Sequence, residues 1–232
     1  MSGYFILTVV MMLISLAIQQ KLKSKFNHYK NTHLSNRLTG KEIAEMMLRD
    51  HNLSGVKIIQ VDGELTDHYN PINRTVNLSR DVYYGENAAA AAVAAHECGH
   101  AVQHATAYSM LQLRSKLVPL QNISATILNI VIFGAAFVGF GLGGSTQFVL
   151  GIILACYTMI TLFALVTLPV EFNASNRALA WMKQKNIVSF TELSGAQDSL
   201  KWAAMTYVAA AAGALVNLLY FLLQFLGANR DD

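Results

Sequence analysis

Two histidines and a glutamate have the types and the spacing that zinc chemistry needs. His96 and His100 enclose the pattern H-E-x-x-H, and Glu97 directly follows the first histidine. On a helix, positions i and i+4 project from the same face, so both imidazoles can bind one ion while Glu97 is offset toward a water molecule beside it. The alternative is a helix whose polar side chains pair locally, which is costly in such an apolar segment. The spacing therefore favours a zinc site.

A catalytic zinc site needs a third protein ligand and one open position. In the metzincin arrangement a glycine and a further histidine would stand where this chain has Gln103 and Thr106, so that arrangement is excluded. His104 continues the i, i+4 series, but it lies about 12 Å along the helix axis from His96. We expect His104 to lie beside the ligands or to be solvated.

Among the acidic residues after the motif, Glu171 is the best candidate for the third ligand. Glu192 is placed to cap a helix, and Asp198 lies in a polar run that we expect to be solvated. Glu171 follows a charge-free stretch, residues 117–170, that reads as a helical hairpin and would return it to the side of the membrane that carries the histidines. The alternative is an interfacial carboxylate paired with Arg177.

The elements that position these residues can be predicted from local signals. Thr39 and Glu42 form a capping box, which predicts a short amphipathic helix ending near residue 51. The Ala-rich stretch 87–106 predicts the helix that carries the motif. β-rich segments separated by turn residues predict a small antiparallel ribbon of three strands, at residues 56–61, 65–69 and 75–78. This ribbon could bind substrate by strand addition.

The composition is that of a membrane protein. Hydrophobic residues make up 53% of the 232 residues and charged residues only 13%, and the mean hydropathy is +0.36. Such a chain is neither disordered nor collagenous, and two cysteines are too few for a disulfide framework. Four stretches are apolar and long enough to span a bilayer, at residues 3–20, 120–141, 147–168 and 203–226. The fold class is therefore predominantly α, a multi-pass membrane protein with four transmembrane helices and a small α+β unit.

The distribution of basic residues predicts the orientation. Of the 17 Lys and Arg residues, 12 lie in residues 20–118 and 4 in residues 169–202, and such a bias marks the cytoplasmic side. The excess therefore explains orientation, and no nucleic-acid partner is needed. The predicted order is an anchor (1–20), a cytoplasmic part with the motif (21–118), a transmembrane hairpin turning near 141–145 (119–168), a cytoplasmic segment with Glu171 (169–202), and a last span with a short tail (203–232).

Four runs of sequence resemble a known family: LTDHYNP at 65–71, NLS at 77–79, AAHECGHAVQH at 94–104 and LPVEFNAS at 168–175. They are similar to the YugP-like neutral zinc metallopeptidases, a family of bacterial membrane proteases, and the similarity covers nearly the whole chain. The resemblance implies a zincin-like unit of gluzincin type, in which His96, His100 and Glu171 bind Zn²⁺ and Glu97 is the catalytic carboxylate. More distant membrane peptidases place an aspartate where this chain has Ser175, so an aspartate-to-histidine bond cannot be carried over.

The function implied is a zinc-dependent endopeptidase of the bacterial plasma membrane. Zinc would activate a water molecule, and Glu97 would accept its proton and later deliver it to the leaving amine. The expected partners are a protein or peptide substrate and the lipid bilayer, and a membrane-protein partner or a homo-oligomer stays open. We expect the active site at the cytoplasmic membrane surface. Two alternatives remain: an intramembrane zinc protease, and a non-catalytic membrane scaffold with a structural zinc.

Overall fold

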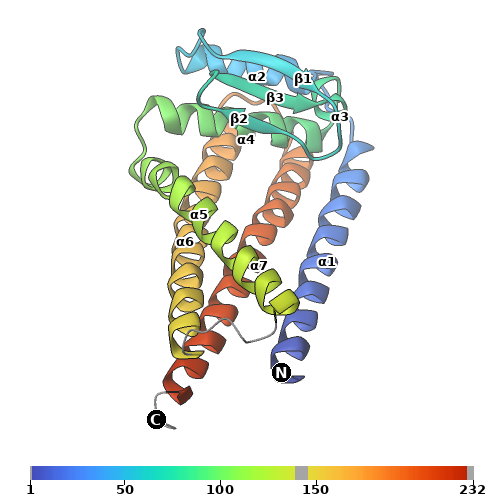
Figure 1. Cartoon of the computed structure of the whole chain (residues 1–232). Coiled ribbons are helices and arrows are strands. Elements are labelled where there is room, and N and C mark those ends of the chain that lie inside the picture. The colour runs from blue at the N-terminus through green and yellow to red at the C-terminus, as the bar shows by residue number, and fades with distance from the viewer. Residues whose placement is uncertain (1, 139–145, 229–232) are drawn as a thin grey trace. The chain divides into compact units, whose positions relative to one another are not determined.

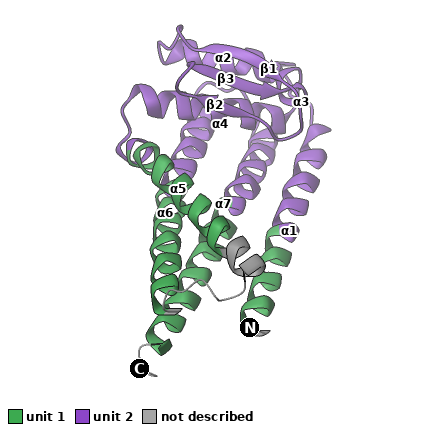
Figure 2. Cartoon of the chain, in the orientation of Figure 1, with its two compact units in different colours: residues 1–15, 113–168, 207–232 green, residues 16–112, 169–206 purple. Residues whose placement is uncertain are grey.

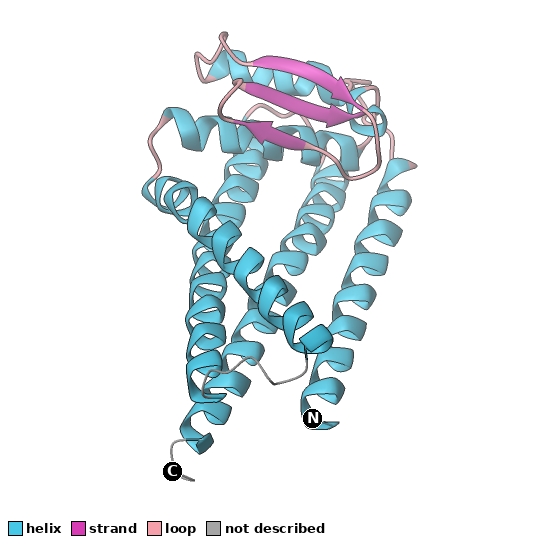
Figure 3. Ribbon diagram, viewed as in Figure 1, coloured by secondary structure: helices cyan, strands magenta, loops and turns pink. Residues whose placement is uncertain are grey.

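The computed structural model describes residues 2–138 and 146–228, and helices dominate it (Figure 1). The helices are α1 (Ser2–Lys30), α2 (Gly40–Asp50), α3 (Arg80–Tyr83), α4 (Ala88–Ala105), α5 (Ser109–Val138), α6 (Thr146–Gln184) and α7 (Phe190–Ala228). The strands are β1 (Lys57–Val61), β2 (His68–Asn70) and β3 (Thr75–Ser79), drawn in magenta in Figure 3. The predicted turn at 141–145 lies outside the described residues.

The chain divides into two compact units, shown in different colours in Figure 2. Unit 1 comprises residues 1–15, 113–168 and 207–232, and unit 2 comprises residues 16–112 and 169–206. Unit 1 is helical where the structure describes it. A small buried cluster of Leu128, Ile153 and Cys156 lies in it, and Tyr157 stacks on Phe221. The sheet, α2, α3 and α4 all belong to unit 2.

Three described helices are long and apolar enough to cross a membrane: residues Gly3–Lys30, Gln147–Gln184 and Phe190–Ala228. They contain three of the predicted spans. The fourth predicted span, 120–141, begins within α5 and ends beyond the described residues, so it stays a prediction. In the most apolar window of the first helix none of the residues is buried, as expected of a surface that faces lipid.

The sheet is mixed, which corrects the predicted antiparallel ribbon. Its strand order is β1-β3-β2, with β1 parallel to β3 and β2 antiparallel to β3. All five residues of β3 are buried, so this strand takes the central place between two strands that are less buried. Residues 62–67 are too long for a tight hairpin, and they lead the chain from β1 to the far edge of β3. Strand β2 is consequently an edge strand.

The two helices predicted from local signals in unit 2 are present at the predicted positions. Thr39 caps α2 in a complete capping box with Glu42. Asn87 caps α4 and accepts a hydrogen bond from the backbone N–H of Ala90. The two helices contribute Ile43, Met47 and a row of alanines to one buried core, together with residues of β3, α6 and α7. Because α4 is buried over most of its length, its polar residues Glu97 and Gln103 lie in the interior of unit 2.

Candidate metal centre

The structure brings His96, His100 and Glu171 together within unit 2. Their ligand atoms all lie within 4.8 Å of one another. The Oε2 atom of Glu171 is 3.3 Å from Nε2 of His96 and 3.4 Å from Nε2 of His100. The side chain of Glu171 is only 4% exposed, and the two histidine side chains are 12% and 13% exposed. The histidines come from α4 and the carboxylate comes from α6, 71 positions later than His100 in the chain.

A glycine inside the motif allows the two helices to approach. A Cβ atom on Gly99 would lie 2.7 Å from the backbone oxygen of Ala174, closer than real Cβ contacts. Gly99 is fully surrounded by protein on that side, so its missing side chain lets α4 rest directly on the backbone of α6. Ala174 is one turn beyond Glu171 on α6, and the close approach therefore places this carboxylate beside the imidazoles.

The three side chains fit a zinc ion on two grounds. With zinc-to-ligand bonds of about 2.0–2.2 Å, atoms at the corners of a tetrahedron lie about 3.3–3.6 Å apart, as the two His–Glu distances do. The Oε2 atom of Glu171 is buried and has no hydrogen-bond partner among the described residues, which is costly unless a cation neutralises it. Burial alone would lower the pKa of His100, but Glu171 and Glu97 raise it overall, so the site favours positive charge.

Glu97 lies beside this cluster with its carboxylate unengaged. The residue is 7% exposed, and no described residue donates a hydrogen bond to it. Asp67 is close enough to sense its charge: burial raises the pKa of Asp67 first, and Glu97 raises it further. Both oxygens of Asp67 are held by Ser79, through its backbone N–H at 2.6 Å and its hydroxyl at 3.2 Å. Sequence reasoning did not single out Asp67.

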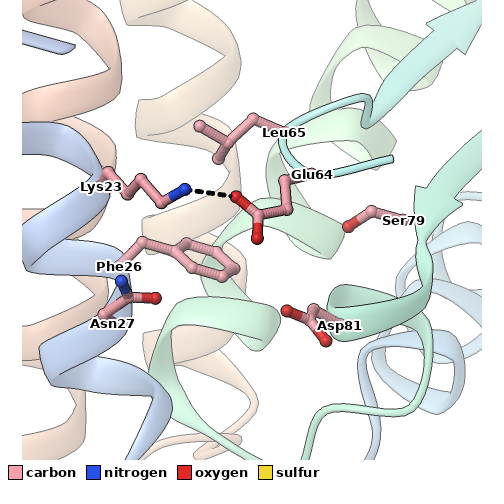
Figure 4. Close-up of a pocket in the computed structure, with 7 residues that line it drawn as sticks. All are labelled: Lys23, Phe26, Asn27, Glu64, Leu65, Ser79 and Asp81. Atoms are coloured by element: carbon pink, nitrogen blue, oxygen red, sulfur yellow. Dashed lines mark hydrogen bonds and ion pairs between the residues drawn. The ribbon is translucent and has the colours of Figure 1, made fainter. Parts of the chain in front are cut away.

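The segment that carries Asp67 is anchored to the end of α1 that belongs to unit 2. Figure 4 shows Lys23 of α1 paired with Glu64 at 2.7 Å, in the wall of a small pocket of about 20 Å³ that is also lined by Phe26 and Ser79. A pocket of that size holds about one water molecule. The ion pair is exposed, so it contributes little stability. It does fix which side of residues 62–67 faces α1 in this structure.

Each imidazole has a separate partner on its second nitrogen. Nδ1 of His96 is 3.0 Å from the hydroxyl of Ser175, and Nδ1 of His100 is 3.0 Å from Oε1 of Gln103. Both contacts leave the Nε2 atoms directed at Glu171. In this structure a serine hydroxyl is therefore the partner of His96. Gln103 was considered in the sequence only as a break in the metzincin pattern, although its position three residues after His100 places it on the same helix face.

The carboxylates set aside in the sequence are engaged elsewhere. Glu192 caps α7 as predicted, through the backbone N–H of Ser189 at 2.6 Å, and it also accepts two hydrogen bonds from Ser35. The prediction that Asp198 is simply solvated was wrong, because Lys25 and the hydroxyl of Tyr29 both bind it. These two acids belong to the packing of unit 2 and lie outside the metal cluster.

The remaining alternatives at the site also have clear positions. Arg177 donates to Oδ1 of Asn173 at 2.7 Å, and no ion pair between Arg177 and Glu171 occurs in the described part of the chain. His104 is exposed, and its Nδ1 is 2.9 Å from the hydroxyl of Tyr69. It does not join the metal cluster. Cys98 is fully buried against α2, and burial raises the pKa of its thiol.

Comparisons with known proteins agree with this chemistry. A family model described as "Putative neutral zinc metallopeptidase" matches residues 4–226. The chain is 40% identical to the protein titled "Putative membrane protease YugP" of Bacillus subtilis (strain 168), over 229 residues that cover 99% of each chain. No solved structure matches the chain.

Proposed function

Because the chain belongs to the "putative neutral zinc metallopeptidase" family, we propose that it is a membrane-bound endopeptidase of gluzincin type. Its metal ligands are His96, His100 and Glu171, and its general base is Glu97. The observation that carries the proposal is the convergence of two imidazole nitrogens and one buried, otherwise unpaired carboxylate oxygen, with a second, unengaged carboxylate one residue from the first ligand.

Each residue has a defined task in peptide hydrolysis. When bound, zinc supplies Lewis acidity that activates water and polarises the scissile carbonyl. Glu97 accepts the proton of the attacking water on its carboxylate and then delivers it to the nitrogen of the leaving amine. Its carboxylate is free for this because no described side chain or backbone group donates to it. No covalent bond between the enzyme and the substrate is required.

The edge strand supports an extended peptide as substrate. Strand β2 pairs with β3 alone among the described strands, and both strands pack against α4, which carries Glu97. A substrate strand can therefore hydrogen-bond to the free edge of β2 beside the catalytic helix. A site at the membrane surface is favoured over one within the bilayer, because the sheet and loops of unit 2 carry backbone groups that need water or protein partners. The excess of Lys and Arg in residues 20–118 and 169–202 favours the cytoplasmic side.

The substitution Glu97→Gln tests whether the protein is an enzyme or a scaffold. Gln keeps the size of the side chain but cannot accept a proton, so zinc should stay bound while cleavage of an unfolded protein should fall by about 10³- to 10⁴-fold. Zinc content is measured by atomic emission, and cleavage is measured with fluorescent casein, on the full chain in detergent.

The matched control is Glu45→Gln, which removes an exposed carboxylate paired with Lys41 and should change neither quantity. A Glu97→Gln protein that held zinc and cleaved at the wild-type rate would refute the proposed base. A wild-type protein that held zinc in this site but never cleaved a peptide would favour the scaffold.

A further inference from the structure

Gln103 is a fully buried amide that touches both halves of the proposed metal centre. Its Oε1 is 3.0 Å from Nδ1 of His100 on α4. Its Nε2 donates to the backbone oxygen of Val170 at 2.8 Å and to Oδ1 of Asn173 at 3.0 Å. Val170 and Asn173 lie on either side of Glu171 on α6. One side chain thus links a ligand on the first helix to the backbone that presents the ligand on the second.

Arg177 determines the direction of each hydrogen bond in the series that runs through Asn173 and Gln103. The guanidinium of Arg177 can only donate, and its Nε is 2.7 Å from the side chain of Asn173, so the atom of Asn173 at that point is the oxygen. The same oxygen lies 3.0 Å from the amide of Gln103, which must therefore present its nitrogen there. The carbonyl of Val170 makes the same demand on that nitrogen.

The side-chain oxygen of Gln103 then determines which ring nitrogen of His100 carries the proton. With the nitrogen committed to α6, the oxygen of Gln103 faces Nδ1 of His100, and an amide oxygen can only accept. Nδ1 must carry the proton, which leaves the lone pair of Nε2 for a metal. Ser175 cannot impose the same order on His96, because a hydroxyl both donates and accepts.

We propose that Gln103 is a positioning residue. Arg177 and Asn173 fix the orientation of its amide, and the amide oxygen in turn fixes the metal-binding tautomer of His100. The same side chain holds α4 against α6 at Glu171. The inference rests on the proposed metal centre. A merely structural role for Gln103 would be to fill space in the core, and then any side chain of similar volume would serve.

The experiment measures zinc affinity by competition with a chromophoric chelator, and ligand geometry by the visible absorption of the Co²⁺-loaded full chain in detergent. Gln103→Leu keeps the volume but removes both hydrogen-bonding atoms. It should weaken zinc binding by about 10- to 100-fold and change the Co²⁺ spectrum. The matched control is Asn77→Leu, which removes another buried amide, one bound to Thr75 and to the carbonyl of His68 and to none of the proposed ligands. This variant should leave the affinity of folded protein within about threefold of wild type.

A pair of variants at Asn173 separates polarity from packing. Asn173→Asp presents only acceptor oxygens to Gln103 and Arg177, so it should keep zinc affinity within about threefold of wild type. Asn173→Leu removes the acceptor and should weaken binding by about tenfold. The proposal is wrong if Gln103→Leu binds zinc as tightly as wild type, if Asn77→Leu weakens binding equally, or if Asn173→Asp behaves as Asn173→Leu does.

A measurement without metal distinguishes failure of this inference from failure of the metal centre. Failure of the metal centre itself shows in zinc binding: if His96→Ala binds zinc as tightly as wild type, the proposed ligand set is wrong. The ¹⁵N chemical shifts of His100 in metal-free protein still report which nitrogen carries the proton. Protonation at Nδ1 in wild type, lost in Gln103→Leu, would support the role of Gln103, and a neutral imidazole protonated at Nε2 alone in wild type would overturn it.

Discussion

Ser175 gives His96 a weaker partner than an ionised carboxylate would. Its hydroxyl is 3.0 Å from Nδ1 of His96 and is buried at 8% exposure, so water does not easily replace it. Hydrogen-bond acceptors on the second nitrogen of a metal-bound histidine orient the ring and raise its basicity. A charged acceptor at this position should do so more strongly than a neutral hydroxyl.

We therefore expect opposite effects from two substitutions at Ser175. Ser175→Ala should weaken zinc binding by about tenfold because His96 loses its partner, and Ser175→Asp should strengthen it. Chelator competition measures both. Ser199→Ala is the control, since Ser199 is another buried helical serine, and its hydroxyl donates to the backbone oxygen of Gly195. Equal affinities for wild type and both Ser175 variants would show that this contact does not affect the metal.

Residues with a spacing rule, or with few competitors of the same type, could be predicted from the sequence, and the others could not. The i, i+4 rule identified His96 and His100, and elimination among the acidic residues identified Glu171 as the group that joins them. The i, i+3 spacing places Gln103 on the helix face of His100, but its role also depends on acceptors that α6 presents from 67 and 70 positions away, and no local spacing reveals these. Asp67 could not be predicted for the same reason, because only the folded sheet places it within electrostatic reach of Glu97.

At the scale of elements, the contact between α4 and α6 depends on the absence of one side chain. Gly99→Ala would place a methyl group 2.7 Å from the backbone oxygen of Ala174, and backbone cannot move aside as a side-chain tip can. We expect α6 to shift, zinc affinity to fall, and the free energy of unfolding to drop by about 1–3 kcal/mol. Chelator competition and thermal unfolding in detergent measure these effects.

Gly55→Ala is the matched control for this prediction. A Cβ atom at Gly55 would have no heavy atom within 4 Å, so the substitution should leave both zinc affinity and stability near those of wild type. A Gly99→Ala protein as stable and as zinc-avid as Gly55→Ala would contradict the close packing described for α4 and α6.

Helices were predictable at this scale, and strand pairing was not. The capping box at Thr39 and the Ala-rich stretch from residue 87 are local signals, and both helices begin where those signals lie. Strand order depends on which strand is buried on both faces, and period-two patterns do not reveal this. Val76 and Leu78 of β3 are buried in the core, and the chain after β1 passes to the far edge of β3, so β1 pairs in parallel with β3 instead of forming a hairpin with β2.

At the scale of the whole molecule, the orientation in the membrane is a prediction from charge. Reporters fused near Lys30 and near Lys185 should both be cytoplasmic, because these sites lie in the two segments rich in Lys and Arg. A reporter at residue 145 should be external. Cysteine accessibility in intact cells offers an independent measurement. Reporters at Lys30 and Lys185 on opposite faces would separate the histidines from Glu171 and refute the metal centre.

The distance along the chain between the ligands has a thermodynamic consequence. A metal ion that joins His100 to Glu171 closes a loop of 71 residues, as a disulfide would. For a free chain, the loss of unfolded-state entropy from a loop of this size is worth about 4 kcal/mol. Insertion of the intervening segment into a bilayer would already restrict the loop and reduce that gain. Zinc removal would then weaken the contact between α4 and α6 as well as stop hydrolysis, so the metal would act as a reversible cross-link within the fold.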